Sequence, residues 1–522
     1  MKKKRRAQAA VLAMLSALAL LPGTALASNH ESDTDTGANR LDFIENRRRS
    51  IRENTPTQEQ ADLYRATQEM KEHLRHPVDA TKAAPTSFEG DYLTYDQNTG
   101  EFIAEGKVHI VQMDGHQFDA VDGLVTGNTI KEEISVPGKA HMLQITPGQS
   151  TITLDGFKTF YRYGAQTGTM EAAEGKVDHQ YVTGKKFEFY PDKIIIYDGT
   201  ATKCNAKKPD YHTSGDKITI YPNDRMVIEH AKFWIKGFVL YSRNRYEQSL
   251  KPGEEKQTQY PRVGYSKDDG VWISQNFTVP FTDNVSGTAH LYADAKHGGR
   301  SRGTIDWNTP HNHYQIAYGY YEDGDENWIK RDPSFRYRYN NKISQASHLN
   351  YNFEVELGRW TKPVDDITSM HRYYKVGLSR DPILLGRKWF LFLGANYSIT
   401  QETYNNSNIR GWGWDVSTVK EFDDRWAAYL AYSYSTSNRQ KSLFDYDLSD
   451  YSRKGQVGFS YRIDDKNRFV LGLGYNFEGN LLEDVDYYWF HDMHCAQFIV
   501  RYHDKRKDSN GSWHVSWEFT PW

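Results

Sequence analysis

Hydrophobic and polar positions alternate with a period of two along most of this chain. In residues 102–110 the even positions are apolar or glycine, whereas the odd positions include Glu105, Lys107 and His109. Successive side chains of a strand point to opposite faces, so such a segment has one apolar and one solvated face. Turn dipeptides such as Pro137-Gly138 separate the segments. We therefore predict an all-β fold.

Strands between about residues 88 and 246 are short and contain an internal repeat. Tyr95, followed by Thr99-Gly100 and then by 104–108 (Ala-Glu-Gly-Lys-Val), is echoed by Tyr163 and the residues after it. Repeated antiparallel units build sandwiches, jelly rolls or folded-over sheets with an apolar interior. If one edge of the sheet stays open, that interior becomes a trough.

The alternating segments become longer and richer in Tyr, Trp and Gly from about residue 262, as in 389–394 and 469–475. Transmembrane strands need ~9–11 residues, so residues 262–522 supply roughly sixteen of them with their connections. A soluble β-sandwich or propeller is the alternative. It would explain the alternation. It would not explain the three features described next taken together, which are the clustering of tryptophans in this region, the aromatic C-terminal end and the N-terminal leader.

Composition supports the barrel. The chain has 36 Tyr, 24 Phe and 13 Trp at a mean hydropathy of -0.78, which excludes a helical membrane bundle. Trp234 is the one tryptophan that precedes Trp272. Rings near strand ends would form the interface girdles of a membrane barrel. The alternating end, Trp513–Trp522, resembles the C-terminal strand signal read by the barrel insertion machinery, which is therefore an expected partner.

Residues 1–27 have the features of a secretory signal peptide. Lys2–Arg6 are basic, Val11–Leu21 are apolar, and Ala25-Leu26-Ala27 forms a cleavage signature before Ser28. A membrane anchor is the alternative, although the apolar stretch is shorter than the ~20 residues of a span. Removing five positive charges changes the formal charge from -3 to -8. An acidic exported chain without a basic stripe is not expected to bind nucleic acid.

Residues 28–85 are polar, and we predict a partly helical linker. Thr57 and Gln60 form a capping-box pattern, and the run ends at Pro77. Between them, apolar residues recur at helical spacing: Leu63, Ala66, Met70 and Leu74. A docking element is the alternative to a solvated linker.

The chain has two cysteines, Cys204 and Cys495. An even pair in an exported protein predicts one disulfide, with two free thiols as the alternative. The stretch from His491 to Cys495 is rich in metal ligands, but His491 and His494 would face opposite sides of a strand, so we predict no metal. Nucleophile-elbow, P-loop and dinucleotide-binding patterns are absent, so we predict neither an enzyme nor a cofactor.

Several motifs occur in an order that resembles one family. Residues 88–96 with 104–108 resemble the opening of the OstA-type β-jellyroll of lipopolysaccharide-transport proteins. Residues 201–204 and 231–237 resemble the jellyroll-to-barrel junction of the LPS-assembly outer-membrane protein (LptD-type), and 261–266 and 492–495 resemble its first and late barrel strands. The resemblance runs from Phe88 to Trp522, with a shorter barrel than in well-known members.

This resemblance implies a translocon in the cell outer membrane, with a signal peptide (1–27), a linker (28–85), a periplasmic β-jellyroll (86–250) and a barrel of roughly sixteen strands (251–522). Lipopolysaccharide would arrive along a bridge of similar jellyrolls (LptA-type) and leave through a lateral seam of the barrel. A plug lipoprotein (LptE-type) would be a further partner. A porin-like diffusion channel is the alternative function, and an adhesin or envelope tether is the third.

The resemblance also implies site residues. A Cys204–Cys495 disulfide would join the periplasmic domain to the late barrel. The lateral seam would lie between the strands near Val271–Phe281 and Trp513–Trp522. The lipid trough would be lined by the apolar members of local alternations, with a closed core as the alternative: Phe102, Val108, Ile110, Phe187, Phe189, Ile218 and Ile220.

Overall fold

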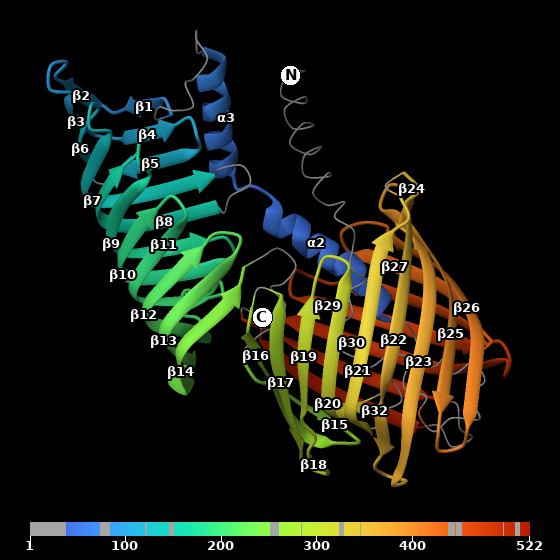
Figure 1. Cartoon of the computed structure of the whole chain (residues 1–522). Helices are drawn as coiled ribbons and strands as arrows, with labels where there is room; N and C mark the ends of the chain where they lie inside the picture. The colour runs from blue at the N-terminus through green and yellow to red at the C-terminus, as the bar shows by residue number, and fades with distance from the viewer. Residues whose placement is uncertain are drawn as a thin grey trace. The chain divides into compact units, whose positions relative to one another are not determined.

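The computed structural model describes residues 38–73, 84–120, 123–145, 151–250, 260–282, 284–322, 328–344, 346–436, 444, 452–493, 495–506 and 512–521. The predicted signal peptide lies outside these residues. The chain divides into two compact units. The sheet unit comprises Thr55–Gln257, and the barrel unit comprises the residues up to Asn54 together with Thr258–Pro521. Nearly all regular structure is β, as predicted (Figure 1).

The sheet unit contains a 14-stranded antiparallel sheet. Its main path runs β1-β4-β5-β7-β8-β9-β10-β11-β12-β13-β14, and β2, β3 and β6 branch from β7. The strands are β1 (Thr86–Glu89), β2 (Tyr92–Tyr95), β3 (Glu101–Glu105), β4 (Val108–Gln112), β5 (His116–Ala120), β6 (Leu124–Asn128), β7 (Glu133–Ile145), β8 (Thr151–Arg162), β9 (Thr167–Val177), β10 (Gln180–Tyr190), β11 (Lys193–Thr202), β12 (Tyr211–Tyr221), β13 (Arg225–Ile235) and β14 (Phe238–Ser249).

Ring contacts show that this sheet folds over on itself. Phe88 of β1 lies 6.3 Å from Tyr163, which follows β8, although β4, β5 and β7 separate those strands in the sheet. Tyr161 of β8 likewise contacts Phe118 of β5 and Phe189 of β10 across the intervening strands. The apolar side chains of one face therefore meet in a common interior, and the opposite face carries the polar positions.

Helix α3 (Gln58–His73) covers part of the outer face of this sheet. Its capping box is present, because the Thr57 amide donates to Gln60 Oε1 at 2.9 Å and the Gln60 amide donates to Thr57 Oγ1 at 3.3 Å. Leu63 packs against Val111 and Leu143. The predicted helix is therefore confirmed over these residues, whereas Leu74 and Pro77 lie outside the described part of the chain.

The barrel unit closes into a sixteen-strand antiparallel barrel, because β18 with β19 and β23 with β24 each form one strand. Its segments are β15 (Arg262–Ser266), β16 (Gly270–Pro280), β17 (Val285–Asp294), β18 (Gly298–Gly299), β19 (Arg302–Asn308), β20 (Asn312–Glu322), β21 (Trp328–Lys342), β22 (Leu349–Lys362), β23 (Ile367–Arg380), β24 (Ile383–Gly386), β25 (Trp389–Glu402), β26 (Ser407–Glu421), β27 (Trp426–Ser435), β28 (Arg453–Arg462), β29 (Asn467–Asn476), β30 (Leu481–Asp492), β31 (Ala496–Lys505) and β32 (Ser512–Pro521).

The barrel unit also includes a short helical segment, η1 (Ala38–Leu41), and helix α2 (Asp42–Asn54). Both lie in the stretch predicted to be a partly helical linker. No described helix combines the length and apolar character needed to cross a membrane. We call the end of the barrel at which β15 begins and β32 ends its base. Because strands alternate in direction, β26 and β28 also end there.

Candidate translocation site

The seven predicted trough residues share the inner face of the folded sheet. Each is at most 4% exposed, and Phe187, Ile218 and Ile220 are completely buried. The register brings them together, since Phe187 lies opposite Ile196, and Ile196 lies opposite Ile218. Their burial in one apolar interior fits a closed core as well as a trough, so the lipid path stays a prediction.

A small pocket lies beside this interior. Phe189, Tyr161 and Ile194 supply apolar walls, and His116 and Gln166 supply polar ones. Burial raises the pKa of the Tyr161 hydroxyl, which keeps this ring neutral at ordinary pH. Among the predicted trough residues, Phe189 is the one that lines this pocket.

The outer face of the sheet unit carries a polar cluster under α3. His109 Nδ1 pairs with Asp119, and His141 Nε2 lies 2.7 Å from Glu59 Oε1. The hydrogen bond to Asp119 raises the pKa of His109. Burial alone would raise the pKa of Asp119, but hydrogen bonds from His109 and Gln117 lower it overall. Glu59, Asp119 and His141 place ligand atoms within 4.8 Å of one another, as a metal site would, yet Glu59 already contacts His141 and Asp119 already contacts His109.

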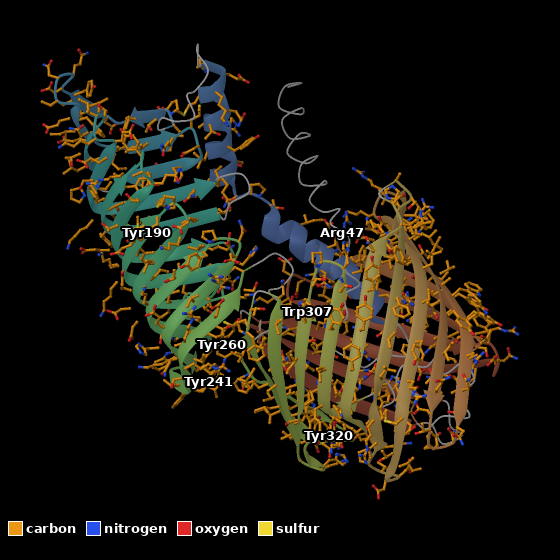
Figure 2. All side chains as sticks on the ribbon, viewed as in Figure 1. Arg47, Tyr190, Tyr241, Tyr260, Trp307 and Tyr320 are labelled. Carbon is orange, nitrogen blue, oxygen red and sulfur yellow. The ribbon has the colours of Figure 1, made fainter. Side chains whose placement is uncertain are left out.

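The barrel wall has an apolar outside and a largely polar lumen. On β26, Trp412 and Trp414 are exposed outward, whereas Ser417 and Glu421, on the other face, are buried. Trp307 of β19 is likewise exposed (Figure 2). This alternation is the one predicted for a strand between lipid and a wet lumen.

Buried charges cross-link the lumen wall between β21 and β22. Arg331 Nη1 lies 3.0 Å from Glu356 Oε1, and Arg336 Nε donates to Glu356 Oε2 at 2.8 Å. The side chains of Arg331 and Glu356 are both 0% exposed. On the next strand, His371 stacks on Trp360 with ring centroids 3.7 Å apart.

Barrel closure is short. β15 has five residues and pairs with β32 at Val263–Phe519, Gly264–Glu518 and Tyr265–Trp517. In contrast, all fourteen residues of β25 pair with β26. Val271 lies on β16 and Phe281 directly follows it, and β16 pairs with β15 and β17. The barrel therefore closes between β15 and β32, and Val271 and Phe281 lie one strand away from this closure. Trp513 lies on β32, and Trp522 lies outside the described residues. A lateral seam at this closure stays a prediction.

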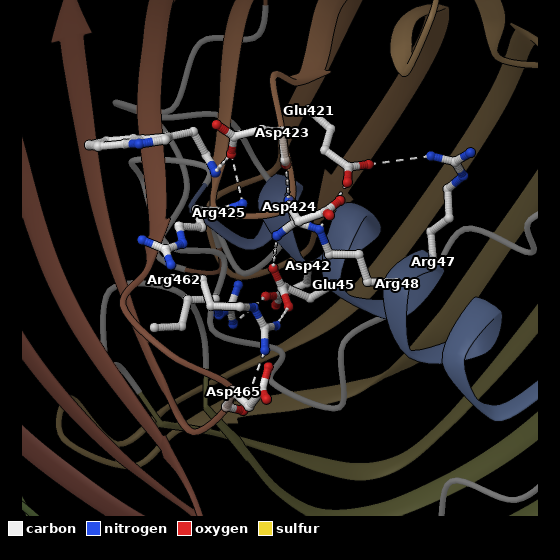
Figure 3. A network of polar contacts seen from close by, with 12 residues as sticks. Asp42, Glu45, Arg47, Arg48, Glu421, Asp423, Asp424, Arg425, Arg462 and Asp465 are labelled. Atoms are coloured by element: carbon white, nitrogen blue, oxygen red, sulfur yellow. Dashed lines mark hydrogen bonds and ion pairs between the residues drawn. The ribbon is translucent and has the colours of Figure 1, made fainter.

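The helical segments η1 and α2, the first that the structure describes, contact the lumen side of the barrel wall, which was not predicted. Arg48 Nε lies 3.1 Å from Glu421 Oε1, and Arg468 Nη2 lies 3.3 Å from Asp42 Oδ1 (Figure 3). Glu45 pairs with Arg462. A signal existed: residues 389–393 and 469–471 are apolar on both strand faces. A strand between lipid and a water-filled lumen needs apolar residues on its outer face only. Apolar residues on the inner face as well indicate that an apolar segment packs against the strand from the lumen.

Neither cysteine is free. Cys204 and Cys495 are both disulfide-bonded, and each is 1% exposed. The prediction of a disulfide is therefore confirmed. His494 lies outside the described residues.

No family model and no curated protein matches this chain. Solved structures that resemble it include engineered variants of the Rh. blastica porin, with 9–10% identity and a TM-score of 0.31, covering 50% of this chain and 98% of the porin. A structure described as a bacterial polysaccharide outer membrane secretin matches at 11% identity and a TM-score of 0.30, covering 50% of this chain and 97% of its own. At these values the likenesses carry no argument about function. The barrel is established by its own strand pairing.

Proposed function

We propose that this protein is an outer-membrane translocon that receives lipopolysaccharide in its sheet unit and releases it through a lateral seam of its barrel. The observation that carries the proposal is the presence, in one chain, of a folded sheet with a continuous apolar interior and of a barrel with a short closure. Lipopolysaccharide has both acyl chains and a large sugar portion, so its passage requires an apolar path beside a polar one.

The sheet unit supports the acyl-chain part of the task. An apolar interior lowers the free energy of an acyl chain by roughly 0.8 kcal/mol per CH₂ relative to water. Among the described strands, β2 pairs with β3 alone, and its Tyr92 and Leu93 are exposed. An open edge strand is a ready surface for pairing with another sheet. We propose a periplasmic jellyroll bridge of the LptA type as the partner that supplies this sheet, in keeping with an OstA-type jellyroll here.

The barrel supports the release step. Opening the β15–β32 closure breaks backbone pairing along only a short stretch, so the seam needs less energy to open than any fully paired neighbour. The apolar outer wall would hold it in the outer membrane, with the sheet unit in the periplasm. A plug lipoprotein of the LptE type is a further candidate partner.

Photocrosslinking in cells tests the lipid path. A photoreactive residue at Phe102, which is 4% exposed on the inner face, should form an adduct with lipopolysaccharide. The neighbouring Ile103 points to the opposite face and is 47% exposed, so the same substitution there is the matched control and should form none. Absence of adducts at Phe102, Ile110 and Phe189 would contradict the proposal.

Depletion of the protein separates the two candidate functions. A translocon predicts less lipopolysaccharide at the cell surface after depletion. Unchanged surface lipopolysaccharide together with reduced uptake of small solutes would instead assign a porin-like diffusion channel.

A further inference from the structure

Part of the lumen wall is apolar, although the lumen elsewhere is polar. We define the lumen patch as the inward-facing apolar residues of β25, β26, β27, β29 and β30, namely Phe390, Phe392, Val419, Ala427, Tyr429, Ala431, Val470, Tyr488 and Phe490. Apolar surface left in contact with water is unfavourable in proportion to its area. A contiguous patch of this kind therefore indicates something that covers it.

The first described residues of the chain cover the lumen patch. Leu41 and Ile44 are 0% and 1% exposed and pack in the same cluster as the lumen patch. The Phe43 ring lies 5.2 Å from the Phe390 and Phe392 rings, edge-on to both. These three apolar side chains lie within one turn of one another, and they all contact the wall.

Complementary charges surround the apolar contact. The acidic residues Asp42 and Glu45 face the wall arginines Arg468 and Arg462. The basic residues on the next turn reverse this arrangement, because Arg47 and Arg48 both pair with the wall carboxylate of Glu421. Acidic residues of the helix therefore pair with basic residues of the wall, and basic residues of the helix pair with an acidic residue of the wall. These ion pairs fix the orientation of the helix as well as its position.

The contacts between the helical segment and the lumen wall begin at the base of the barrel. Glu421 and Arg462 end β26 and β28, and Arg48 Nη2 also donates to the carbonyl of Asp423 in the turn that follows β26, at 2.7 Å. The contact of Arg40 with Ser417 lies farther up β26, at 2.8 Å. The segment therefore extends from the base into the lumen (Figure 3).

We propose that residues 38–54 are a built-in plug, which closes the barrel lumen to solutes while it is seated and opens it when it leaves. Two properties of the helix would allow it to leave the lumen. Its sequence, Asp-Phe-Ile-Glu-Asn-Arg-Arg-Arg-Ser-Ile-Arg-Glu-Asn, is mostly charged and stays soluble in water. No described residue of it pairs with a barrel strand through a β-ladder. The lumen patch is thus an interaction surface for residues 38–54 of the same chain, and this inference does not depend on which molecule passes through the barrel.

Conductance of the purified full-length protein in planar lipid bilayers tests the plug. I44D places a carboxylate on the lumen patch and should unseat the helix. Burial of an unpaired carboxylate is so unfavourable that we expect the fraction of time spent open to rise roughly a hundredfold. The matched control is I51D, on the same helix but 49% exposed, which should conduct like the wild type.

Folding is checked by the heat-dependent shift of the barrel on gels. A folded I44D protein that conducts no more than the wild type would overturn the proposal. If I44D fails to fold, a charge swap decides: E45R should open the lumen, and E45R combined with R462E should close it again. An E45R protein that stays closed, or a double variant that stays open, would overturn the proposal. Lipopolysaccharide crosslinking is read separately, so failure of the plug and failure of the proposed function can be distinguished.

Discussion

Substitution of Glu356 by Gln should destabilise the barrel far more than the same substitution two residues away. Glu356 pairs with Arg331 and Arg336, and its side chain is 0% exposed. The isosteric amide removes the charge that balances Arg331, which is equally buried. Removing one partner of a buried ion pair costs about 3–5 kcal/mol, because the remaining charge is left uncompensated.

The matched control is E354Q, which lies on the same strand and the same face. Glu354 lies 3.5 Å from Arg336 Nε, farther than the 2.8 Å hydrogen bond that Arg336 Nε donates to Glu356. Its shorter contact is with Arg338, and these two side chains are 18% and 39% exposed. Solvent screens this pair, so its loss should cost roughly 1 kcal/mol or less.

Equilibrium unfolding in guanidinium chloride, followed by tryptophan fluorescence, measures the difference. With a slope on the order of 4 kcal/mol per molar, E356Q should lower the midpoint by about 1 M and E354Q by a quarter of that or less. Equal midpoints for the two variants would refute the reasoning that the lumen charges are shielded from water.

Two further predictions concern the cysteines and an ion pair of the sheet unit. On gels of native membranes, the protein should migrate differently with and without reductant, because Cys204 and Cys495 are disulfide-bonded; identical migration would contradict the bond. The His109–Asp119 pair should stabilise the sheet unit between the lowered pKa of Asp119 and the raised pKa of His109. That stabilisation is lost as pH falls through the first pKa or rises through the second. The thermal midpoint of H109Q should therefore differ most from the wild type near pH 5 to 6, by a small amount because the pair is partly solvated. A difference that grows at alkaline pH would reverse the sign and reject the argument.

The fold class followed from the sequence because a period of two is local. Each segment such as 102–110 reports its own strand, and the length of the alternating region after residue 262 limits the number of spans. Helix α3 was also predictable, since Thr57, Gln60 and Leu63 lie close together in the chain.

The lumen helix could not be found in the same way. The apolar residues of its first part are few, and its partners lie on strands hundreds of residues later. Its trace in the sequence was indirect: Phe390, Phe392 and Val470 are apolar at positions where a lumen face should be polar. The strand β15 was found through the resemblance of residues 261–266 and not through its pattern, because five residues carry too little alternation to stand out.

The position of the plug in the chain constrains the order of assembly. Helix α2 is made before any barrel strand, yet Glu45 pairs with Arg462, 417 residues farther along. Its seat does not exist until β25 to β30 have folded side by side. Contacts of such long sequence separation form late, because the intervening chain must first be ordered. The helix can therefore dock only onto a wall that has already formed, so its docking would indicate, from within the same chain, that strands β25 to β30 have assembled.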